Sequence, residues 1–473
     1  MRRIFVISVA AAALLILSCG QKRSVEKDSF FRYEASEGTL ASVLDTLTAA
    51  VSGWQKEGKM VGAEMLVIRG RDIILHRVFG WADREDSIPM RRNTICRIRS
   101  MTKPVVGTAV WILHEQGKLE LSDRVAQYLP SFDNPDSDSI TVYQLMTHTA
   151  GFEQTGFPEG SIYEYPSLEA GVKDLGEKGP QNPPGEQYIY SDGGSSTLAR
   201  LVAAISGMPC EDFLRENIFE PLNMNDTYCN APESDSLRRR FSSTYSWQDG
   251  QFGKYWDNQQ EQELPFFRGS GGIYTTPLDY ARFLYAWSNP QDEFLSGKTR
   301  ERALESTDFN EGYALQWEIY HRNDSLGIAF GHGGSDGTVA ISFPDRELLA
   351  LFFTQTRGTV AVALFEELIF TQLGYQEPPD YREADLTGKQ AEKILGVYRM
   401  KPWEGRIYLE NGKWRIRFNQ NQPLDILPLS EEEFVIPDIG VTLKFLYDET
   451  GNIYQMNFIR GGNVQEFEKV QQK

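Results

Sequence analysis

Ser100 and Lys103 are the two residues whose types and spacing most directly suggest chemistry. They form the tetrad Ser100-Met101-Thr102-Lys103, and a separation of three positions places both side chains on one face of a helix. A serine in the first helical turn lies near unpaired backbone N–H groups that can stabilise an oxyanion. A neutral lysine one turn later can accept the serine proton. The pattern predicts a serine nucleophile activated by a lysine.

The lysine can act as a base only if its pKa falls far below the usual value. Moving the pKa from about 10.4 to about 7–8 requires roughly 3–5 kcal/mol of differential destabilisation of the ammonium form. Burial supplies part of it, and a second cation or a polar network must supply the rest. We therefore expect such a group near Lys103.

The tetrad alone is a weak signal, because about two matches to Ser-x-x-Lys are expected by chance in a chain of this length. The other match, Ser24-Val25-Glu26-Lys27, lies in a polar stretch with no helical pattern after it. Ser100 is followed by residues 104–117, whose apolar positions form a helical stripe ending at Gly117. The alternative role for Ser100 is a simple helix N-cap.

The composition is globular and limits the partners. The chain has 473 residues, 41% hydrophobic and 24% charged, which is enough for a large core. Its net charge of −18 repels phosphate backbones, so no nucleic acid partner is expected. The five histidines show no metal-binding spacing and Cys-x-x-Cys does not occur, so neither a metal site nor another cofactor is expected.

The N-terminus has the pattern of an exported lipoprotein. Residues 1–18 join two arginines to an apolar run too short for a comfortable membrane span, as in a signal peptide. Residues 16–20 resemble a bacterial lipobox, which predicts lipidation of Cys19 and a tether over 19–36. We expect a bacterial cell-envelope protein, lipid-anchored and facing the periplasm or exterior. Ordinary cleavage nearby is the alternative.

Three further cysteines remain after such processing. Cys210 and Cys229 could pair in an oxidising compartment, leaving Cys96 unpaired. The favoured interpretation is three buried thiols that act as small hydrophobic side chains.

The hydrophobic pattern predicts an α/β (α+β) protein with one sheet built from distant segments. Helices are expected at 37–58, 104–117, 194–206, 277–288 and 359–373, and strands at 61–68, 73–80, 314–320, 327–331, 339–343 and 348–354. The strands bracket a long, partly helical middle, which would form a subdomain against the sheet. The cleft between the two is the natural place for a site. This unit is expected to span 37–373.

The last part of the chain has a different pattern. A charged, proline-containing linker is expected over 374–387. Asn411-Gly412 stands between two strand-like runs and predicts a hairpin. Residues 388–473 should form a small antiparallel β domain, closed or sandwich-like, with no catalytic constellation of its own.

Two further motifs follow the tetrad in an order typical of one enzyme superfamily. They are Tyr190-Ser191-Asp192 and His332-Gly333-Gly334. The chain thereby resembles the serine β-lactamase and penicillin-binding-protein superfamily, in the class C-like branch that includes D-peptidases and family VIII esterases. Further stretches that resemble this branch are 97–104, 145–152, 219–224 and 271–276.

The resemblance implies a role for each matching residue. Ser100 is then the acylated nucleophile, Lys103 its activator and Tyr190 the second proton-relay group. It also implies a β-lactamase-like fold, in which an antiparallel sheet flanked by helices adjoins a mainly helical subdomain.

The third motif would occupy the strand that carries Lys-Thr-Gly in β-lactamases. The backbone N–H groups of Ser335 and Ser100 would form the oxyanion hole, and Gly334 would let a substrate lie close to the strand. In β-lactamases, a lysine at this position attracts the carboxylate of the β-lactam. Here the position is occupied by His332, and a histidine there resembles peptidase-like and esterase-like members. Lys298-Thr299-Arg300 has no strand pattern and is not that element.

Asp192 is a second departure, because asparagine is common at its position. An extra carboxylate would hold Lys103 as a cation or contact a substrate amine. Together with His332, it argues against efficient β-lactam hydrolysis. His148 matches a structural position that holds the loop before Gly151, so it is not assigned to the site.

Residues 333–337 also match G-x-S-x-G, the nucleophile motif of α/β-hydrolases. That motif needs a helix after the turn, whereas the residues that follow are strand-like. It also needs a later triad histidine, and none follows His332.

The sequence therefore predicts an exported serine hydrolase that forms an acyl-enzyme on an amide or ester. Peptides with D-residues from cell-wall material, or small esters, are the expected substrates. The alternatives are a catalytically silent envelope binding protein of the same fold and a true class C-type β-lactamase.

Overall fold

The computed structural model describes most of the chain. It covers residues 30–34, 39–154, 157, 162–230, 234–258, 264–323, 325–375, 381–386, 388–400, 403–419, 421–460 and 463–470. The predicted signal peptide and Cys19 lie outside these residues, so the lipid anchor stays a prediction. Within the predicted tether, Arg32–Tyr33 form strand β1, which pairs with the central sheet. Of the helices in the covered ranges, none is long and apolar enough to cross a bilayer.

Distant segments build one central sheet, as the sequence predicts. Its order is β1-β3-β2-β13-β12-β11-β10, with β4 pairing to β3. All neighbours are antiparallel except β1 and β3. The strands are β2 (Gly62–Arg69), β3 (Asp72–Asp83), β4 (Ile88–Pro89), β10 (Glu318–Asn323), β11 (Gly327–Gly334), β12 (Thr338–Phe343) and β13 (Leu348–Phe353).

Each face of the sheet packs against a different pair of helices. Leu66 and Ile68 of β2 belong to a core with α2 (Thr102–Glu115) and α8 (Pro277–Ser288). Met65 and Val67 belong to a second core with α1 (Thr39–Lys56) and α10 (Ala361–Gln372). Successive strand residues point to opposite faces, so a run apolar at every position is buried on both sides.

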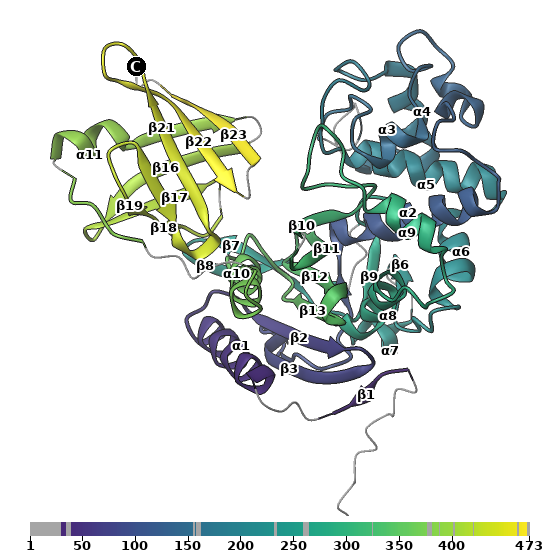
Figure 1. Cartoon of the computed structure of the whole chain (residues 1–473), viewed down its shortest axis with the longest axis horizontal. Coiled ribbons are helices and arrows are strands. Elements are labelled where there is room, and N and C mark those ends of the chain that lie inside the picture. Colours follow the sequence, from purple (N-terminus) through teal and green to yellow (C-terminus); the bar gives the residue numbers. More distant parts are fainter. Residues whose placement is uncertain are drawn as a thin grey trace, which may run out of the picture.

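The middle of the chain forms a helical lobe beside the sheet (Figure 1). Its helices are α3 (Val142–Met146), α4 (Leu168–Lys178), α5 (Asp192–Ser206), α6 (Cys210–Leu214), α7 (Asp235–Arg238) and α9 (Gly297–Ala303). Two small sheets lie outside the central sheet, β5-β9-β6 and β14-β7-β8, and Figure 1 shows β7 and β8 near α10, on the side of the C-terminal part. Their strands are β5 (Cys96–Arg97), β6 (Tyr228–Cys229), β7 (Thr244–Gln248), β8 (Gln251–Trp256), β9 (Ile273–Thr275) and β14 (Thr356–Arg357).

The predicted strand at 314–320 is wrong in its first half, because β10 begins only at Glu318. Gln316 has a φ of +68° and turns the chain there. Its buried side chain donates to the Met146 carbonyl (3.0 Å) and accepts from the Ser195 hydroxyl (3.2 Å). These bonds compensate for a conformation that non-glycine residues seldom adopt. Lys298-Thr299-Arg300 lies in helix α9.

The C-terminal part is one strongly curved antiparallel sheet of order β18-β17-β16-β15-β23-β22-β21-β20-β19 (Figure 1). Its end strands β18 (Leu424–Asp425) and β19 (Leu427–Pro428) are separated by Ile426 alone, so the sheet curls into a barrel. The other strands are β15 (Gly396–Met400), β16 (Trp403–Glu410), β17 (Lys413–Phe418), β20 (Glu433–Ile436), β21 (Val441–Tyr447), β22 (Ile453–Arg460) and β23 (Asn463–Lys469).

Two features of this barrel bear on the predictions. The hairpin at Asn411-Gly412 is present, and both residues have positive φ, as the tight turn requires. The sequence reading missed a short helix, α11 (Gly388–Ile394), whose Ile394 is buried in the barrel core.

The barrel is packed against the rest of the protein through α10. Val360 and Leu364 belong to the same apolar cluster as the barrel interior. At Gly358, which has a φ of +66°, an added Cβ would meet the Asn421 side chain at 2.7 Å. The barrel therefore packs directly against α10 and the residues just before this helix.

The three cysteines in the described part are free thiols. Cys96 and Cys210 are buried, and Cys229 is half-buried. Burial raises the pKa of all three thiols, which matches the favoured interpretation that they act as apolar side chains.

Candidate active site

Ser100 lies in a short 3₁₀ turn (Arg99–Met101) between β5 and α2. The segment before it is tied to β9, because the Ile98 N–H donates to the Ile273 carbonyl (3.0 Å). The residue directly before Ser100, Arg99, has a φ of +46°. A non-glycine residue held in this region carries backbone strain, which is common at functional sites. The strain places Ser100 at a sharp turn at the start of a helix.

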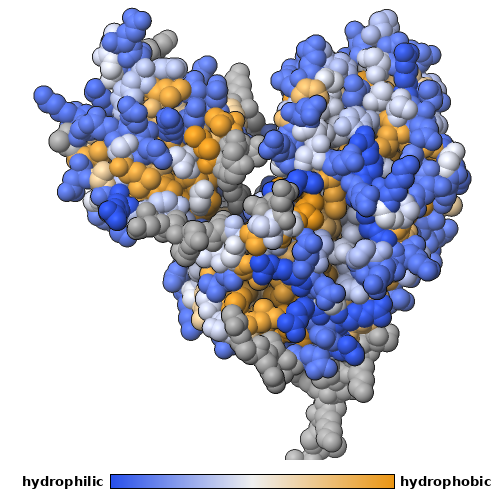
Figure 2. All heavy atoms as spheres, viewed as in Figure 1, coloured by the Kyte–Doolittle hydropathy of each residue, from blue (hydrophilic) through white to orange (hydrophobic). Residues whose placement is uncertain are grey.

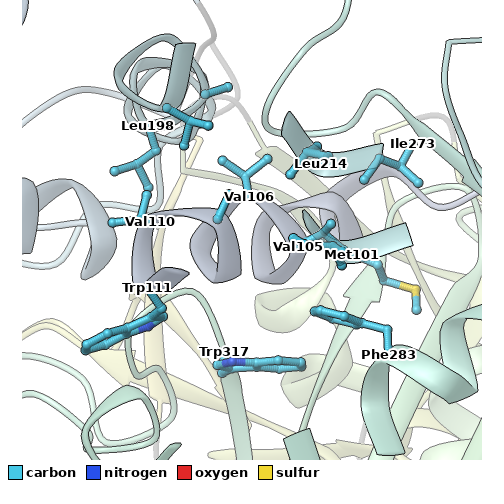
Figure 3. Packing of buried hydrophobic residues seen from close by; sticks show 14 of the residues in the cluster. Met101, Val105, Val106, Val110, Trp111, Leu198, Leu214, Ile273, Phe283 and Trp317 are labelled. Atoms are coloured by element: carbon cyan, nitrogen blue, oxygen red, sulfur yellow. The ribbon is translucent and has the colours of Figure 1, made fainter. Parts of the chain in front are cut away.

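Helix α2 is held on two sides by large apolar side chains (Figure 3). Trp317 and Phe283 lie beneath the helix, on the side to which its own Trp111 projects, and the Trp317 and Phe283 rings stack with centroids 5.8 Å apart. Leu198 of α5 and Leu214 of α6 lie on the opposite side. Such close packing leaves the helix little freedom, so the first turn presents Ser100 and Lys103 in one fixed geometry.

The structure brings Lys103 directly to Ser100. Its Nζ atom is fully buried and donates to Ser100 Oγ (3.2 Å), to Asp192 Oδ1 (2.8 Å) and to the Ser270 carbonyl (3.2 Å). An ammonium has three N–H donors, so these acceptors satisfy the charged form. Loss of a proton would leave Lys103 with a lone pair that can accept the Ser100 proton.

Burial and charge act in opposite directions on Lys103. Burial lowers the pKa of Lys103, the Asp192 carboxylate opposes it, and the Arg268 guanidinium lowers it again. Burial by itself would raise the pKa of Asp192, but Lys103 and Arg268 outweigh it and lower that pKa to about 2. Asp192 is therefore an anion at neutral pH, and Arg268 Nη2 lies 3.8 Å from it.

Arg268 is the second cation that the lysine chemistry requires, and sequence reasoning did not find it. It lies in a loop before Gly269 and Ser270, far in the sequence from Lys103. No motif marks it, because an arginine in a polar loop is ordinarily a surface residue. Only the return of this loop to α2 makes it part of the site.

Tyr190 completes the group around Ser100. Its ring centroid lies 4.4 Å from Lys103 Nζ. Burial raises the pKa of Tyr190 well above its usual value, the Asp192 charge adds to this, and the neighbouring Ser100 side chain opposes it. The phenol is therefore neutral and can both donate and accept a hydrogen bond.

His148 positions the segment that carries Tyr190. Its Nδ1 accepts from the Ser191 N–H (3.1 Å), and its carbonyl accepts from the Ile189 N–H (2.8 Å). Burial lowers the pKa of His148 well below its usual value, and Lys103 adds to this effect. The neutral ring then carries its proton on Nε2, which faces the Tyr313 hydroxyl at 3.1 Å.

His332 lies on β11 and is completely buried. Burial lowers its pKa, and the Glu318 carboxylate, 3.5 Å away, opposes the shift. Its Nδ1 lies 2.7 Å from the Gly333 carbonyl, which can only accept, so the ring proton is on Nδ1. Nε2 lies 3.4 Å from the Tyr313 hydroxyl. Tyr313 therefore links the two neutral histidines of the site.

Gly334 and Ser335 form the turn between β11 and β12. A Cβ at Gly334 would lie 2.3 Å from the Ile98 carbonyl oxygen, so only glycine allows this strand to approach the nucleophile segment. Ser335 is exposed. Because a strand follows the turn, residues 333–337 form a β-hairpin. The α/β-hydrolase elbow, which needs a helix here, is excluded.

Asp336 joins this hairpin to the nucleophile segment. Its carboxylate accepts from Arg97 Nε (2.7 Å) and Arg99 Nε (3.0 Å), and Arg357 Nε lies 3.3 Å away. Burial alone would raise the pKa of Asp336, but the three arginines lower it to about 2. Both arms of the expected oxyanion hole are therefore fixed by one buried carboxylate that sequence reasoning did not identify.

In the described part of the chain, one cluster of three carboxylates has the spacing to hold a metal ion, and it does not include any residue of the candidate active site. Asp83, Asp86 and Asp257 approach one another closely. Lys254 Nζ lies 2.7 Å from Asp83, 3.2 Å from Asp86 and 3.7 Å from Asp257. The lysine ammonium supplies the positive charge there.

Comparison with known proteins connects this geometry to a family. A family model described as Beta-lactamase matches residues 44–369. Penicillin-binding protein 4* of Bacillus subtilis (strain 168) is 24% identical over 410 residues, covering 81% of this chain and 90% of that protein. Esterase EstB of Burkholderia gladioli is 30% identical over 202 residues, covering 39% of this chain and 51% of the esterase.

A solved structure shares the fold over nearly the whole length. The octameric penicillin-binding protein homologue from Pyrococcus abyssi has a TM-score of 0.65 and 19% identity, covering 90% of this chain and 98% of that one. The alignment therefore extends beyond the residues that the family model matches. The chain belongs to the beta-lactamase family, whose members are serine hydrolases.

Proposed function

We propose that the protein is an exported serine hydrolase in which Ser100, Lys103 and Tyr190 form and break an acyl-enzyme. The observation that carries the proposal is the 3.2 Å contact between Lys103 Nζ and Ser100 Oγ at a fully buried lysine. A lysine in bulk water holds its proton, whereas a desolvated one can exchange it with a neighbouring hydroxyl.

The reaction starts with the Ser100 proton. Ser100 Oγ attacks the substrate carbonyl carbon while its proton passes to neutral Lys103. The carbonyl oxygen becomes an oxyanion between the N–H groups of Ser100 and Ser335. The bond to the leaving group then breaks, and the leaving group receives a proton from Tyr190, which regains one from Lys103. Water repeats the sequence on the acyl-enzyme and releases the acid.

Amides and esters of cell-envelope material are the proposed substrates. The names of two relatives, a D-alanyl-D-alanine-carboxypeptidase/endopeptidase of Escherichia coli and the esterase EstB, point to D-alanyl-D-alanine peptides and to esters. The signal-peptide pattern points to export into the cell envelope. His332 is neutral and buried, so it offers no cation to a β-lactam carboxylate. We therefore expect ester or D-peptide hydrolysis to exceed hydrolysis of a chromogenic cephalosporin.

The decisive test is Ser100→Ala, assayed with p-nitrophenyl acetate and with D-alanyl-D-alanine peptides. Turnover should fall by about 10⁵–10⁶-fold, and the protein should still fold because only a hydroxyl is lost. Ser335→Ala should cost far less, because the mechanism uses only the backbone N–H of that residue.

A fluorophosphonate probe separates this proposal from a catalytically silent binding protein. The probe should label the wild type at Ser100 and leave Ser100→Ala unlabelled. Turnover that persists in Ser100→Ala would contradict the assignment, and a wild type that neither turns over nor labels would favour the silent protein.

A further inference from the structure

A cavity of about 730 Å³ extends from the catalytic residues to the C-terminal barrel. Tyr190 lines one end, Ile439 and Phe458 of the barrel line the other, and α10 lies along one side. Figure 2 shows a deep notch between the barrel and the helical lobe. The barrel is therefore one wall of a space that has the catalytic residue Tyr190 at its other end.

Among the described residues, the charged side chains that line this cavity are all carboxylates. Glu318, Glu366 and Glu367 line it, and no lysine or arginine is among the lining residues that the structure describes. The walls also carry the rings of Tyr188 and Tyr313. Carboxylates and aromatic faces both attract ammonium groups, the first by charge and the second through the ring quadrupole.

Of the three carboxylates that line the cavity, Glu318 is the one that contacts the strand of His332 and Gly333. Its Oε2 accepts from the Gly333 N–H (3.1 Å) and from the Tyr320 hydroxyl (2.7 Å). These two donors fix the position of the side chain. The side chain remains 33% accessible, so part of it still faces the cavity. Asp192, the other carboxylate near the site, is already engaged by Lys103 and Arg268.

We propose that this cavity is a substrate subsite for a primary ammonium group, with Glu318 as its specificity determinant and the barrel as its outer wall. The inference rests on the proposed function, since it names the substrate class of that same site. The substrate is then an ester or amide that carries an amine on the part held between Tyr190 and the barrel. N-acetylation of that amine removes the charge and should weaken binding.

The test measures inhibition of p-nitrophenyl acetate hydrolysis by two matched compounds, D-alaninamide and N-acetyl-D-alaninamide. The wild type should bind the amine about tenfold more tightly, which corresponds to about 1.4 kcal/mol. Glu318→Gln keeps the shape and loses the charge, so the ratio of the two inhibition constants should fall toward one. Glu311→Gln removes the same charge from an exposed residue outside the lining and should leave the ratio unchanged.

A third inhibitor, Nα-acetyl-D-lysinamide, carries its amine at the end of the side chain. Preference for D-alaninamide would place the ammonium beside the reacting carbonyl, and preference for the lysine compound would place it deeper in the cavity. Either preference supports the proposal if Glu318→Gln removes it. If the wild type hydrolyses p-nitrophenyl acetate but its ratio of inhibition constants is near one, or if Glu318→Gln leaves that ratio unchanged, the subsite proposal is overturned. If the wild type shows no turnover at all, the proposed function fails, and this inference fails with it.

The barrel wall has its own test. Gln465 of β23 lines the cavity, and Gln465→Lys would add a cation there. We expect the inhibition constants of the amine compounds to rise about threefold to tenfold, with little change for N-acetyl-D-alaninamide. Gln455→Lys makes the same change on β22, outside the lining, and serves as the control. Equal behaviour of the two variants would remove the barrel from the subsite.

Discussion

Two buried carboxylates hold the region around Ser100, and they differ in their partners. Asp336 is surrounded by Arg97, Arg99 and Arg357, whereas Asp192 contacts Lys103 and Arg268. Both carboxylates have a pKa of about 2. Their roles separate at the cations, because an arginine keeps its proton under all ordinary conditions and a buried lysine can lose it.

This difference explains which cluster holds the structure and which can do chemistry. The Asp336 cluster has a constant charge, so it fixes the hairpin of Gly334 and Ser335 against the strained turn at Arg99. The Asp192 cluster contains one group whose charge can change, and that group touches the Ser100 hydroxyl. The Asp336 cluster therefore keeps its charge and geometry while a proton moves in the Asp192 cluster.

The largest expected effect comes from making the two clusters alike. Lys103→Arg places a permanent cation beside Asp192 and removes the only exchangeable proton of the cluster. We expect kcat/KM for p-nitrophenyl acetate to fall by about 10³-fold or more, the size of a lost general base. Lys298→Arg, on the helix α9 away from the site, is the matched control. If Lys103→Arg keeps more than about a tenth of the activity, Lys103 is not the proton acceptor.

The sequence predicted the framework of the fold well where hydrophobic periodicity is strong. Strands β2, β12 and β13 follow their apolar runs, because burial on both faces leaves long apolar segments. Helix α5 begins at Asp192, two residues before its predicted start. The glycines at 193 and 194 are poor helix formers, so the sequence pattern did not indicate a helix there. The Ser191 side chain nevertheless caps the helix by accepting from the Gly194 N–H at 3.1 Å.

Residue spacing alone predicted only the local part of the candidate site, whereas Tyr190, Asp192 and His332 were expected from the family resemblance. Ser100 and Lys103 are neighbours on one helix turn, so their spacing already implies contact. Arg268, Asp336 and Glu318 come from three separate segments and meet Ser100 only after folding. A single sequence holds no spacing signal for such contacts. The charge that lowers the pKa of Lys103 and the carboxylate that lines the cavity were therefore not predicted.

The second effect concerns stability. Asp336→Asn leaves three guanidinium groups without their common anion, and we expect the free energy of unfolding to fall by about 3–5 kcal/mol. Asp192→Asn should cost less, because Lys103 can give up its proton when its partner carboxylate is removed. Urea unfolding of the two variants at pH 7 measures both values. Equal losses would contradict the distinction between fixed and exchangeable cations.

The same cluster predicts a pH dependence. The ordinary pKa of an aspartate is 3.8, and that of folded Asp336 is about 2, so the folded state binds this proton less readily than the unfolded state. The contribution of Asp336 is therefore complete above about pH 4 and is lost as the pH falls to about 2, by roughly 2 kcal/mol. Arg357→Gln, a milder change at a partly exposed arginine, should reduce this loss and serves where Asp336→Asn does not fold.

The smallest effect tests Arg268, the cation that ties Asp192 to the loop before Ser270. Arg268 lowers the pKa of Lys103, so Arg268→Gln should raise it and move the rising limb of the kcat/KM profile to higher pH. At a pH on that limb, kcat/KM should fall about twofold to fivefold, since a lost charge interaction of this kind is worth up to about 1 kcal/mol. At high pH the variant should recover, which a purely structural defect would not allow. Arg200→Gln removes the same charge from α5, the helix that also carries Asp192, where Arg200 Nη2 lies 2.8 Å from Glu169. That control should leave the profile unmoved, and an equal shift in both variants would mean that the net charge of the protein, not Arg268, sets the pKa of Lys103.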